Sequence, residues 1–404
     1  MKKIIVIILV VVAILISLLL YNGNKNKERL QAIKNQEIEE SFSDFVITNK
    51  KTKLYDKNKN ETGDINSSVK LRLDKDQIDG YYRLKDFDEY YIYYKDFDKT
   101  DSYYEYDSSY KKYIVFNKNV KTEGKTSFYD DKFNYLYTVN KEYELPLYIN
   151  DDEFYGVEYD DHLVYIKKGN DVELIDANNS SEENAKSIPV FLYHFFHNHT
   201  RFDNMTTVIS MRIDRFEEQM KYLSDNDFMT LKLKDLENYI KGKVQIKEKS
   251  VVITIDDGSS TIYSLAYPVL EKYKINATVF AITSNDSDAI KKQTDYVEIH
   301  SHTHNMHQTG KCSGGQGGYF KCIDYNLGIE DLKKSRELLN NTTYLAYPFG
   351  EYTDNSIKML KDSGFTMALT TNYGNAKVGD DPYLVPRIYI YNEYGIDTFK
   401  RLVN

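Results

Sequence analysis

VVITIDDG, residues 251–258, is an apolar, β-branched run that ends in two acidic residues and a glycine. A run of this kind predicts a buried strand. Two adjacent carboxylates at its end are costly to bury unless a cation lies beside them. Asp256 and Asp257 are therefore candidates for a metal site or for catalysis, and a solvated Asp-Asp-Gly turn is the plainer alternative.

The segments on both sides of this strand alternate between strand patterns and helical patterns. The strand patterns cover residues 277–282, 344–347 and 367–370, and the helical patterns cover residues 213–223, 262–273, 329–339 and 355–360. This alternation is typical of a parallel sheet or barrel with helices on its outside. Functional side chains in such folds lie at the carboxyl ends of the strands.

A second polar cluster, EIHSHTHNMH at residues 298–307, holds four of the chain's eight histidines. Two histidines and one carboxylate would make a three-ligand zinc site that keeps a position open for water. His300 and His304 could share a helix face, whereas His302 and His307 lie five residues apart and would converge only in a loop. The spacing does not choose between these pairs, and a surface tract that binds metal without function is also possible.

Taken together, TIDDG and HTHNMH resemble the first two motifs of the NodB-homology polysaccharide deacetylases, carbohydrate esterase family 4. The resemblance implies that Asp256 is the catalytic base and that Asp257, His302 and His307 hold the metal. The spacing of the two histidines is one residue longer than usual, and this resembles the branch that deacetylates poly-N-acetylglucosamine. The pair with the usual spacing, His300 and His304, remains the alternative.

The resemblance covers residues 187–404 and implies a deformed (β/α) barrel. The implied cofactor is Zn²⁺, although two histidines and one aspartate would also accept Co²⁺ or Ni²⁺. The implied activity is removal of N-acetyl groups from N-acetylglucosamine in peptidoglycan or in poly-N-acetylglucosamine. A wall glycan-binding protein without activity and a metal-dependent amidase are the alternatives.

AYPFG, residues 346–350, resembles the third motif of the family. In that motif Tyr347 and Pro348 lie on the substrate side, and the backbone N–H of Phe349 donates to the oxyanion. Ala346 stands where the family has an arginine that positions the base. We expect Arg387, near the C-terminus, to take the place of that arginine.

The general acid of the family is the histidine of a Leu-x-His motif on the final strand. Here Leu-Tyr-His occurs upstream of the other motifs, at residues 192–194, in the permuted order of the same branch. The resemblance therefore implies that His194 is the acid. The chain has no tryptophan, so the fourth motif of the family is missing.

The chain has two cysteines, Cys312 and Cys322, on either side of a glycine-rich segment that follows the histidine cluster. A disulfide between them would restrain this loop and would fit an extracytoplasmic compartment. Two free thiols are the alternative.

Residues 4–20 are apolar except for one serine, and two lysines precede them. Seventeen helical residues span roughly 25 Å, just enough for the core of a bilayer. Residues 1–21 are therefore expected to form a signal anchor, with a cleaved signal peptide as the alternative. The predicted location is the cell membrane, single-pass, with an extracytoplasmic catalytic domain.

A polar stalk is expected at residues 22–43, and a linker at residues 178–186. Between them, residues 44–110 and 111–177 have the turns and alternation of short strands and form an approximate repeat. The repeat resembles tandem bacterial SH3-like modules, which often bind cell-wall components; a spacer without a ligand is the alternative.

The formal charge is −9, with 53 basic and 62 acidic residues and no basic block, so nucleic acid is not an expected partner. The expected partners are an N-acetylglucosamine polymer, the cell wall through the SH3-like modules, and the membrane through the N-terminal helix.

Overall fold

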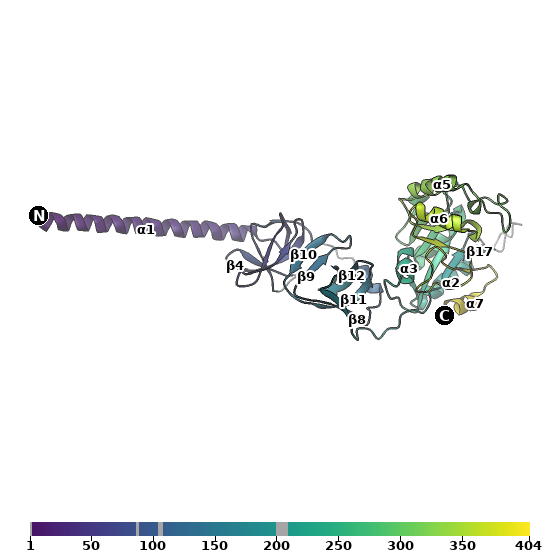
Figure 1. Cartoon of the computed structure of the whole chain (residues 1–404), viewed down its shortest axis with the longest axis horizontal. Helices are drawn as coiled ribbons and strands as arrows, with labels where there is room; N and C mark the ends of the chain where they lie inside the picture. The colour runs from purple at the N-terminus through teal and green to yellow at the C-terminus, as the bar shows by residue number, and fades with distance from the viewer. Residues whose placement is uncertain (1, 86–88, 104–107, 199–208) are drawn as a thin grey trace. The chain divides into compact units, whose positions relative to one another are not determined.

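The structure is a computed structural model that describes residues 2–85, 89–103, 108–198 and 209–404, without the side chains of residues 2–16 and 18. The chain divides into two compact units (Figure 1). The first unit consists of Met1–Tyr110, Lys118–Leu147 and Asp152–Ala177. The second consists of Lys111–Asn117, Tyr148–Asp151 and Asn178–Asn404.

The N-terminal part of the chain is one helix, α1 (Lys2–Ser41). It runs through both the predicted anchor and most of the predicted stalk, and the side chains of most of the anchor lie outside the described residues. In the part of the chain that the structure describes, no helix is both apolar enough and long enough to cross a membrane. Near the end of α1, Ile38 is buried and its carbonyl accepts a hydrogen bond from the hydroxyl of Tyr82.

Apart from α1 and a 3-10 helical turn at Ser108–Lys112 that begins in this unit, the regular structure of the first unit is all-β among its described residues. Its strands are β1 (Phe45–Thr48), β2 (Thr52–Tyr55), β3 (Glu61–Ile65), β4 (Lys70–Ile78), β5 (Tyr81–Leu84), β6 (Tyr91–Tyr93), β7 (Phe97–Lys99), β8 (Lys118–Thr122), β9 (Thr126–Tyr129), β10 (Tyr135–Val139), β11 (Glu144–Asn150), β12 (Phe154–Tyr159), β13 (His162–Lys167) and β14 (Val172–Asp176). The strand order is β14-β8-β11-β12-β13-β9-β10-β3-β2-β6-β5-β4-β1-β7. The antiparallel pairing of β10 with β3 joins the first seven strands to the last seven.

The two halves of this unit contain the same turn, as a repeat requires. Asp56 accepts hydrogen bonds from the backbone N–H groups of Asn58 and Asn60 and from the side chain of Asn60. Asp130 accepts the corresponding bonds from residues 132 and 134. An aspartate that caps its own turn in this way fixes the connection between two strands, so both halves share this turn, and the repeat of whole modules stays a prediction. The SH3-like assignment remains a prediction.

The second unit is built on a sheet in which all strands are parallel. Its order is β23-β22-β21-β20-β19-β15-β24, and β18 pairs with β19 beside this path. The strands are β15 (Val190–Tyr193), β18 (Met229–Thr230), β19 (Ser250–Ile255), β20 (Ala277–Ala281), β21 (Val297–Ser301), β22 (Tyr344–Ala346), β23 (Met367–Leu369) and β24 (Ile388–Tyr389). Two further strands, β16 (Phe195–His197) and β17 (Ser210–Arg212), form a separate parallel pair.

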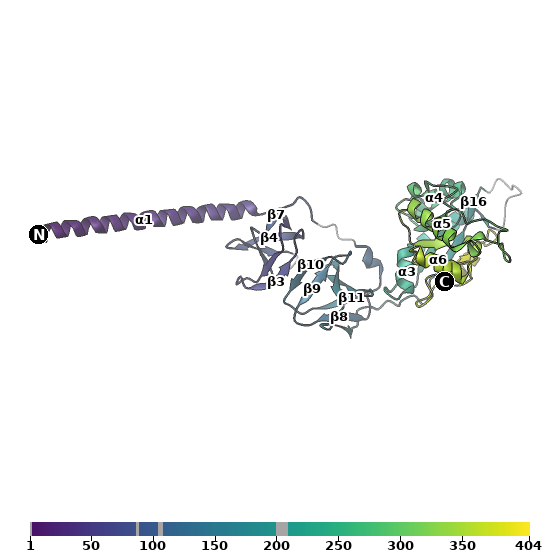
Figure 2. The ribbon, with the colours of Figure 1, turned by 45° about the horizontal axis from the view of Figure 1, so that its top comes forward.

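Helices accompany these strands, as the alternation predicted. They are α2 (Ile213–Asp225), α3 (Leu233–Ile240), α4 (Tyr267–Tyr273), α5 (Tyr325–Leu338), α6 (Asp354–Asp362) and α7 (Ile396–Val403), with a π-helical turn at Ile262–Ala266 before α4. Figures 1 and 2 show α5 and α6 side by side. Their buried faces share one core with β22, through Leu332, Met359 and Leu345. The expected deformed barrel-like parallel sheet is confirmed.

The two edges of the sheet approach each other after β23. Leu369 forms a parallel bridge with Val385, and the N–H of Thr370 donates to the carbonyl of Val385 at 2.8 Å. Three residues beyond Val385 the chain enters β24, which pairs with β15. The segment 385–389 therefore lies between both edges, and this position brings Arg387 toward the ends of the central strands.

Candidate active site

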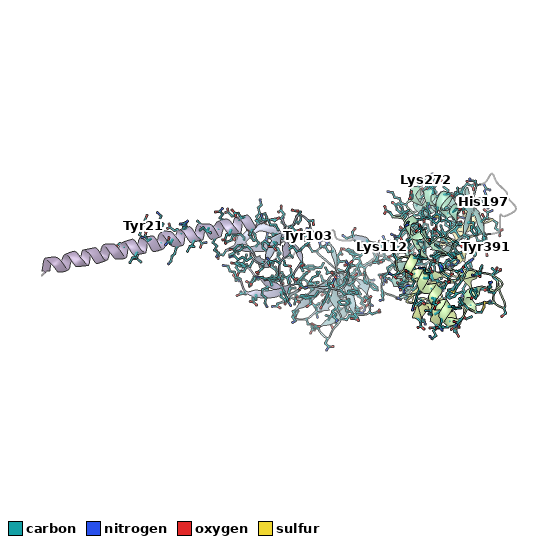
Figure 3. The ribbon with its side chains drawn as sticks, turned by 90° about the horizontal axis from the view of Figure 1, so that it is seen from above. Tyr21, Tyr103, Lys112, His197, Lys272 and Tyr391 are labelled. Carbon is teal, nitrogen blue, oxygen red and sulfur yellow. A yellow bond between two sulfur atoms is a disulfide. The ribbon has the colours of Figure 1, made fainter. Side chains whose placement is uncertain are left out.

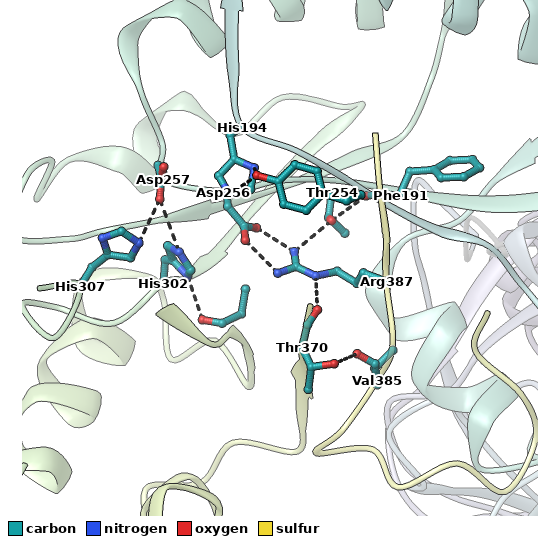
Figure 4. A network of polar contacts seen from close by, with 12 residues as sticks. Phe191, His194, Thr254, Asp256, Asp257, His302, His307, Thr370, Val385 and Arg387 are labelled. Carbon is teal, nitrogen blue, oxygen red and sulfur yellow. Dashed lines mark hydrogen bonds and ion pairs between the residues drawn. The ribbon is translucent and has the colours of Figure 1, made fainter. Parts of the chain in front are cut away.

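The chemically active side chains gather where the parallel strands end. His194 follows β15, the Asp256–Asp257 pair follows β19, and His302 follows β21. Because the carboxyl ends of parallel strands lie at one edge of the sheet, residues far apart in the chain meet there. Figure 4 shows this group from close by.

Asp256 and Arg387 form a buried, two-pronged ion pair. Nη1 and Nη2 of Arg387 donate to Oδ1 and Oδ2 of Asp256, each at 2.8 Å. Nε of Arg387 donates to the carbonyl of Thr370 at 2.7 Å, and Nη1 also donates to Oγ1 of Thr254 at 3.2 Å. Asp256 is 2% exposed and Arg387 is 1% exposed. Burial alone would raise the pKa of Asp256, but Arg387 and His302 outweigh it and hold the pKa below its usual value.

Asp257, His302 and His307 form the group that could hold a metal. One possible ligand atom from each residue lies within 4.8 Å of the other two. Nε2 of His302 lies 3.5 Å from Oδ1 of Asp257, and Nε2 of His307 lies 3.4 Å from the same oxygen. Oδ1 of Asp257 is buried and has no hydrogen-bond partner. A buried carboxylate oxygen without a donor, facing two imidazole nitrogens, fits a divalent cation.

The orientation of His302 supports the same conclusion. Its Nδ1 lies 2.8 Å from the carbonyl oxygen of Ala346, which can only accept a hydrogen bond. Nδ1 therefore carries a proton, and Nε2 is left to coordinate. Burial alone would raise the pKa of Asp257, but the adjacent imidazole of His302 outweighs burial and lowers this pKa to about 2. The pKa of His307 is lowered to about 4, chiefly by burial, which leaves its imidazole neutral for metal binding.

Three residues of this region have a left-handed backbone that non-glycine residues rarely adopt. The φ angles are 76° at Asp257, 70° at Thr303 and 58° at Phe349. Each residue follows one of the strand ends that carry the polar groups. Strained backbone of this kind is concentrated at functional sites, where the surrounding structure maintains it.

His194 lies beside Tyr389 in a cavity of about 540 Å³, which is also lined by Phe349 and Arg387. The two rings are nearly parallel, at 14°, with centroids 5.1 Å apart, and the Tyr389 hydroxyl lies 3.0 Å from Nδ1 of His194. Burial lowers the pKa of His194, while the carboxylates of Asp256 and Asp257 oppose this shift. Tyr389 was not among the site residues predicted from the sequence. The alternation Tyr-Ile-Tyr at residues 389–391 was the pattern that could have indicated it.

The third motif contributes less to the cavity than the resemblance implies. Tyr347 is fully buried and packs against Phe320 and Tyr352 in the core, and Pro348 is buried as well. The Tyr347 ring points into the core of the unit and does not line the cavity, so the expectation that Tyr347 and Pro348 bind substrate stays a prediction. Phe349 does line the cavity, and its ring centroid lies 4.2 Å from that of His307.

The alternative histidine pair does not meet at Asp257. His300 lies within β21, where Nδ1 is 2.6 Å from Oγ1 of Thr342. His304 lies 3.0 Å from Oγ1 of Thr283. Both side chains are therefore engaged in contacts with threonines, away from Asp257. The spacing of His300 and His304 would bring them together only on a helix, and His300 lies in a strand.

Cys312 and Cys322 form a disulfide that closes a glycine-rich loop. Glu351, directly after the third motif, accepts hydrogen bonds from the N–H groups of Gln316 and Gly318 at 2.6 and 2.7 Å. Since Gln316 lines the cavity, the disulfide and Glu351 together hold one wall of the site.

Comparison with known proteins places the chain among deacetylases. The polysaccharide deacetylase family matches residues 243–368. The poly-beta-1,6-N-acetyl-D-glucosamine N-deacetylases of Staphylococcus epidermidis and Staphylococcus aureus are 33% and 32% identical over 213 residues, covering 48% of this chain and 71% of each relative. Among solved structures, the Streptococcus pyogenes deacetylase PplD in complex with acetate has a TM-score of 0.48 and 21% identity, covering 54% of this chain and 98% of that one.

Proposed function

The chain belongs to the polysaccharide deacetylase family, and we propose that it is a metal-dependent enzyme that removes N-acetyl groups from a polymer of β-linked N-acetylglucosamine. That it is a polysaccharide N-deacetylase follows from its relatives. The observation that carries metal dependence is the unpartnered oxygen of Asp257 facing His302 and His307. The relatives favour poly-β-1,6-N-acetylglucosamine as the substrate over peptidoglycan.

The proposed roles follow from the contacts. Zn²⁺ held by Asp257, His302 and His307 would supply Lewis acidity to the acetamide carbonyl and to water. Asp256, ionised and fixed by Arg387, accepts the proton of the water whose oxygen attacks the carbonyl carbon. This geometry makes Arg387 a positioning residue for the base.

The second half of the reaction uses two residues that line the cavity, Phe349 and His194. The N–H of Phe349 donates a hydrogen bond to the developing oxyanion. His194 donates a proton to the nitrogen while the carbon–nitrogen bond breaks. The products are acetate and a sugar with a free amine. Burial lowers the pKa of His194, and the nearby carboxylates of Asp256 and Asp257 only partly offset this shift.

The rest of the chain is proposed to hold the enzyme near its polymer. The apolar run at residues 4–20 supports a membrane anchor, and the disulfide supports an extracytoplasmic location. The repeated β-unit is proposed to consist of two SH3-like modules that bind the cell wall. Fractionation of cells that produce the full chain would test the anchor, and sedimentation of residues 44–177 with purified walls would test the modules.

The function is tested by offering the fragment 40–404 both peptidoglycan and a β-1,6-linked N-acetylglucosamine pentamer, with zinc present. Acetate from the pentamer and little from peptidoglycan is the expected result. Acetate from peptidoglycan alone would overturn the choice of polymer. No acetate from either, with zinc bound, would favour a glycan-binding protein or an amidase.

A further inference from the structure

The last strand carries tyrosines on one face and isoleucines on the other. Ile388 and Ile390 are 3% and 2% exposed, and both belong to the hydrophobic core. The N–H of Ile390 donates to the carbonyl of Leu192, so the chain stays extended beside β15 for one residue past β24. Because side chains alternate along an extended chain, Tyr389 and Tyr391 lie on the opposite face. Both are half-buried and line the cavity of the candidate active site.

These rings form a continuous row with His194 at one end. Tyr389 lies nearly parallel to His194, and Tyr391 lies nearly parallel to Tyr389, at 12° and 4.7 Å between centroids. The ring of Tyr394 is nearly perpendicular to that of Tyr391, with an interplanar angle of 80° and centroids 5.3 Å apart. We call Tyr389, Tyr391 and Tyr394 the tyrosine row. All three line the same cavity, and Tyr391 is labelled in Figure 3.

The chemistry of the row suits a sugar. Aromatic rings present flat, apolar faces, while tyrosine also carries a hydroxyl at its edge. A β-linked pyranose has apolar C–H faces and a rim of hydroxyl groups, so it complements such a ring. The cavity also contains polar groups from Gln316 and Thr371, which are suited to orient the rim of a sugar.

We propose that the tyrosine row binds a sugar next to the one that loses its acetyl group. The inference rests on the proposed function, because the row starts at His194, the proposed acid. A site of this kind makes the enzyme prefer internal sugars of a chain over a free monosaccharide. The row then contributes to polymer binding, while the chemical step stays with Asp256 and His194.

The test compares acetate release from N-acetylglucosamine and from its β-1,6-linked pentamer. For the wild type, kcat/KM is expected to be higher on the pentamer. Tyr391→Ala should lower the pentamer-to-monomer ratio of kcat/KM by about three- to tenfold, chiefly through KM of the pentamer, since a ring contact of this kind is lost. Tyr391→Phe keeps the ring and should keep most of the ratio. Tyr325→Ala, on α5 outside the cavity lining, is the control for loss of a tyrosine.

Equal losses on monomer and pentamer, or a Phe variant that behaves like the Ala variant, would overturn the proposal. Calorimetric titration with the pentamer separates this proposal from the proposed function. If the wild type binds the pentamer but releases no acetate, the function fails, and a three- to tenfold weaker Kd for Tyr391→Ala still supports the row. An unchanged Kd in that variant would contradict it.

Discussion

Arg387 binds both carboxylate oxygens of Asp256 at 2.8 Å, although 131 positions separate the two residues in the chain. Ala346, which replaces the motif arginine, has no side chain that could do this. Arginine can bind a carboxylate at two points and stays charged, so it fixes both the orientation and the charge of Asp256, the proposed base. The candidate active site therefore has an arginine on this carboxylate that is supplied by the residue directly before β24.

Replacing Arg387 with Met should move the acid limb of the pH–rate profile to higher pH. The base must be ionised to accept a proton, and Arg387 holds the pKa of Asp256 below its usual value. Without the guanidinium that pKa rises, so activity is lost at a pH where the wild type still works. Arg387→Lys keeps a charge and should shift the limb less. A variant that is only less heat-stable, with an unshifted limb, would show a purely structural role.

Asp256→Asn should reduce kcat by about 10²–10⁴-fold and leave metal content unchanged, because Asp256 is the proposed base and Asp257 the proposed ligand. Acetate release and atomic absorption on the same sample measure both quantities. Wild-type kcat in this variant would show that the base has been assigned wrongly.

The two histidine pairs can be separated by metal content. His302→Ala and His307→Ala should each lose the metal together with activity, because both nitrogens face Asp257. His304→Ala is the matched control in the same segment, and it should retain the metal. Loss of metal in the His304 variant alone would favour the alternative pair.

Opening the disulfide should cost stability and polymer turnover but not metal. Cys312→Ser with Cys322→Ser should lower the free energy of unfolding by about 3 kcal/mol, the value for a short loop. Since Gln316 would lose part of its restraint, kcat/KM on the pentamer should fall. Glu351→Gln, with the disulfide intact, separates the effect of the Glu351 hydrogen bonds from the effect of the cross-link. Equal thiol counts in native and reduced protein would contradict the bridge.

Protonation of Glu237 should make the catalytic unit less stable in acid. Glu237 is 3% exposed and accepts hydrogen bonds from Tyr344 and Lys241 at 2.8 and 2.6 Å. Burial opposes its ionisation, but these partners lower its pKa. A depressed pKa stabilises the fold above the unfolded-state pKa, and this contribution is lost as pH falls through the folded-state pKa.

Glu237→Ala removes the acceptor for a buried hydroxyl, which costs about 1–3 kcal/mol. The thermal midpoint at neutral pH should fall by a few degrees. As pH is lowered, the midpoint of the variant should then fall less than that of the wild type. A variant with the wild-type pH dependence would show that another group is responsible.

The sequence predicted the catalytic unit well, because its strands are strongly apolar and its helices amphipathic. The strand at residues 251–255 and the helical face at residues 213–223 lie inside β19 and α2. The sequence could not choose between the histidine pairs, since that choice depends on where β21 ends. It also gave no warning that Tyr347 points into the core, because the motif's spacing does not fix the direction of a side chain.

The tyrosine row escaped prediction for a different reason. Tyrosine is abundant throughout the chain, with 38 copies, so a few more near the C-terminus attract no notice. Only the pairing of β24 with β15 shows that Tyr389 lies beside His194.

The most direct test removes the metal and restores it. Fragment 40–404 is treated with a chelator, dialysed, and assayed for acetate release from the β-1,6-linked pentamer before and after one equivalent of Zn²⁺ is added. We predict no release before the addition and recovered release after it, with Asp256→Asn inactive under both conditions. Release that persists without metal, or that stays absent when zinc is bound, would contradict a metal-dependent deacetylase.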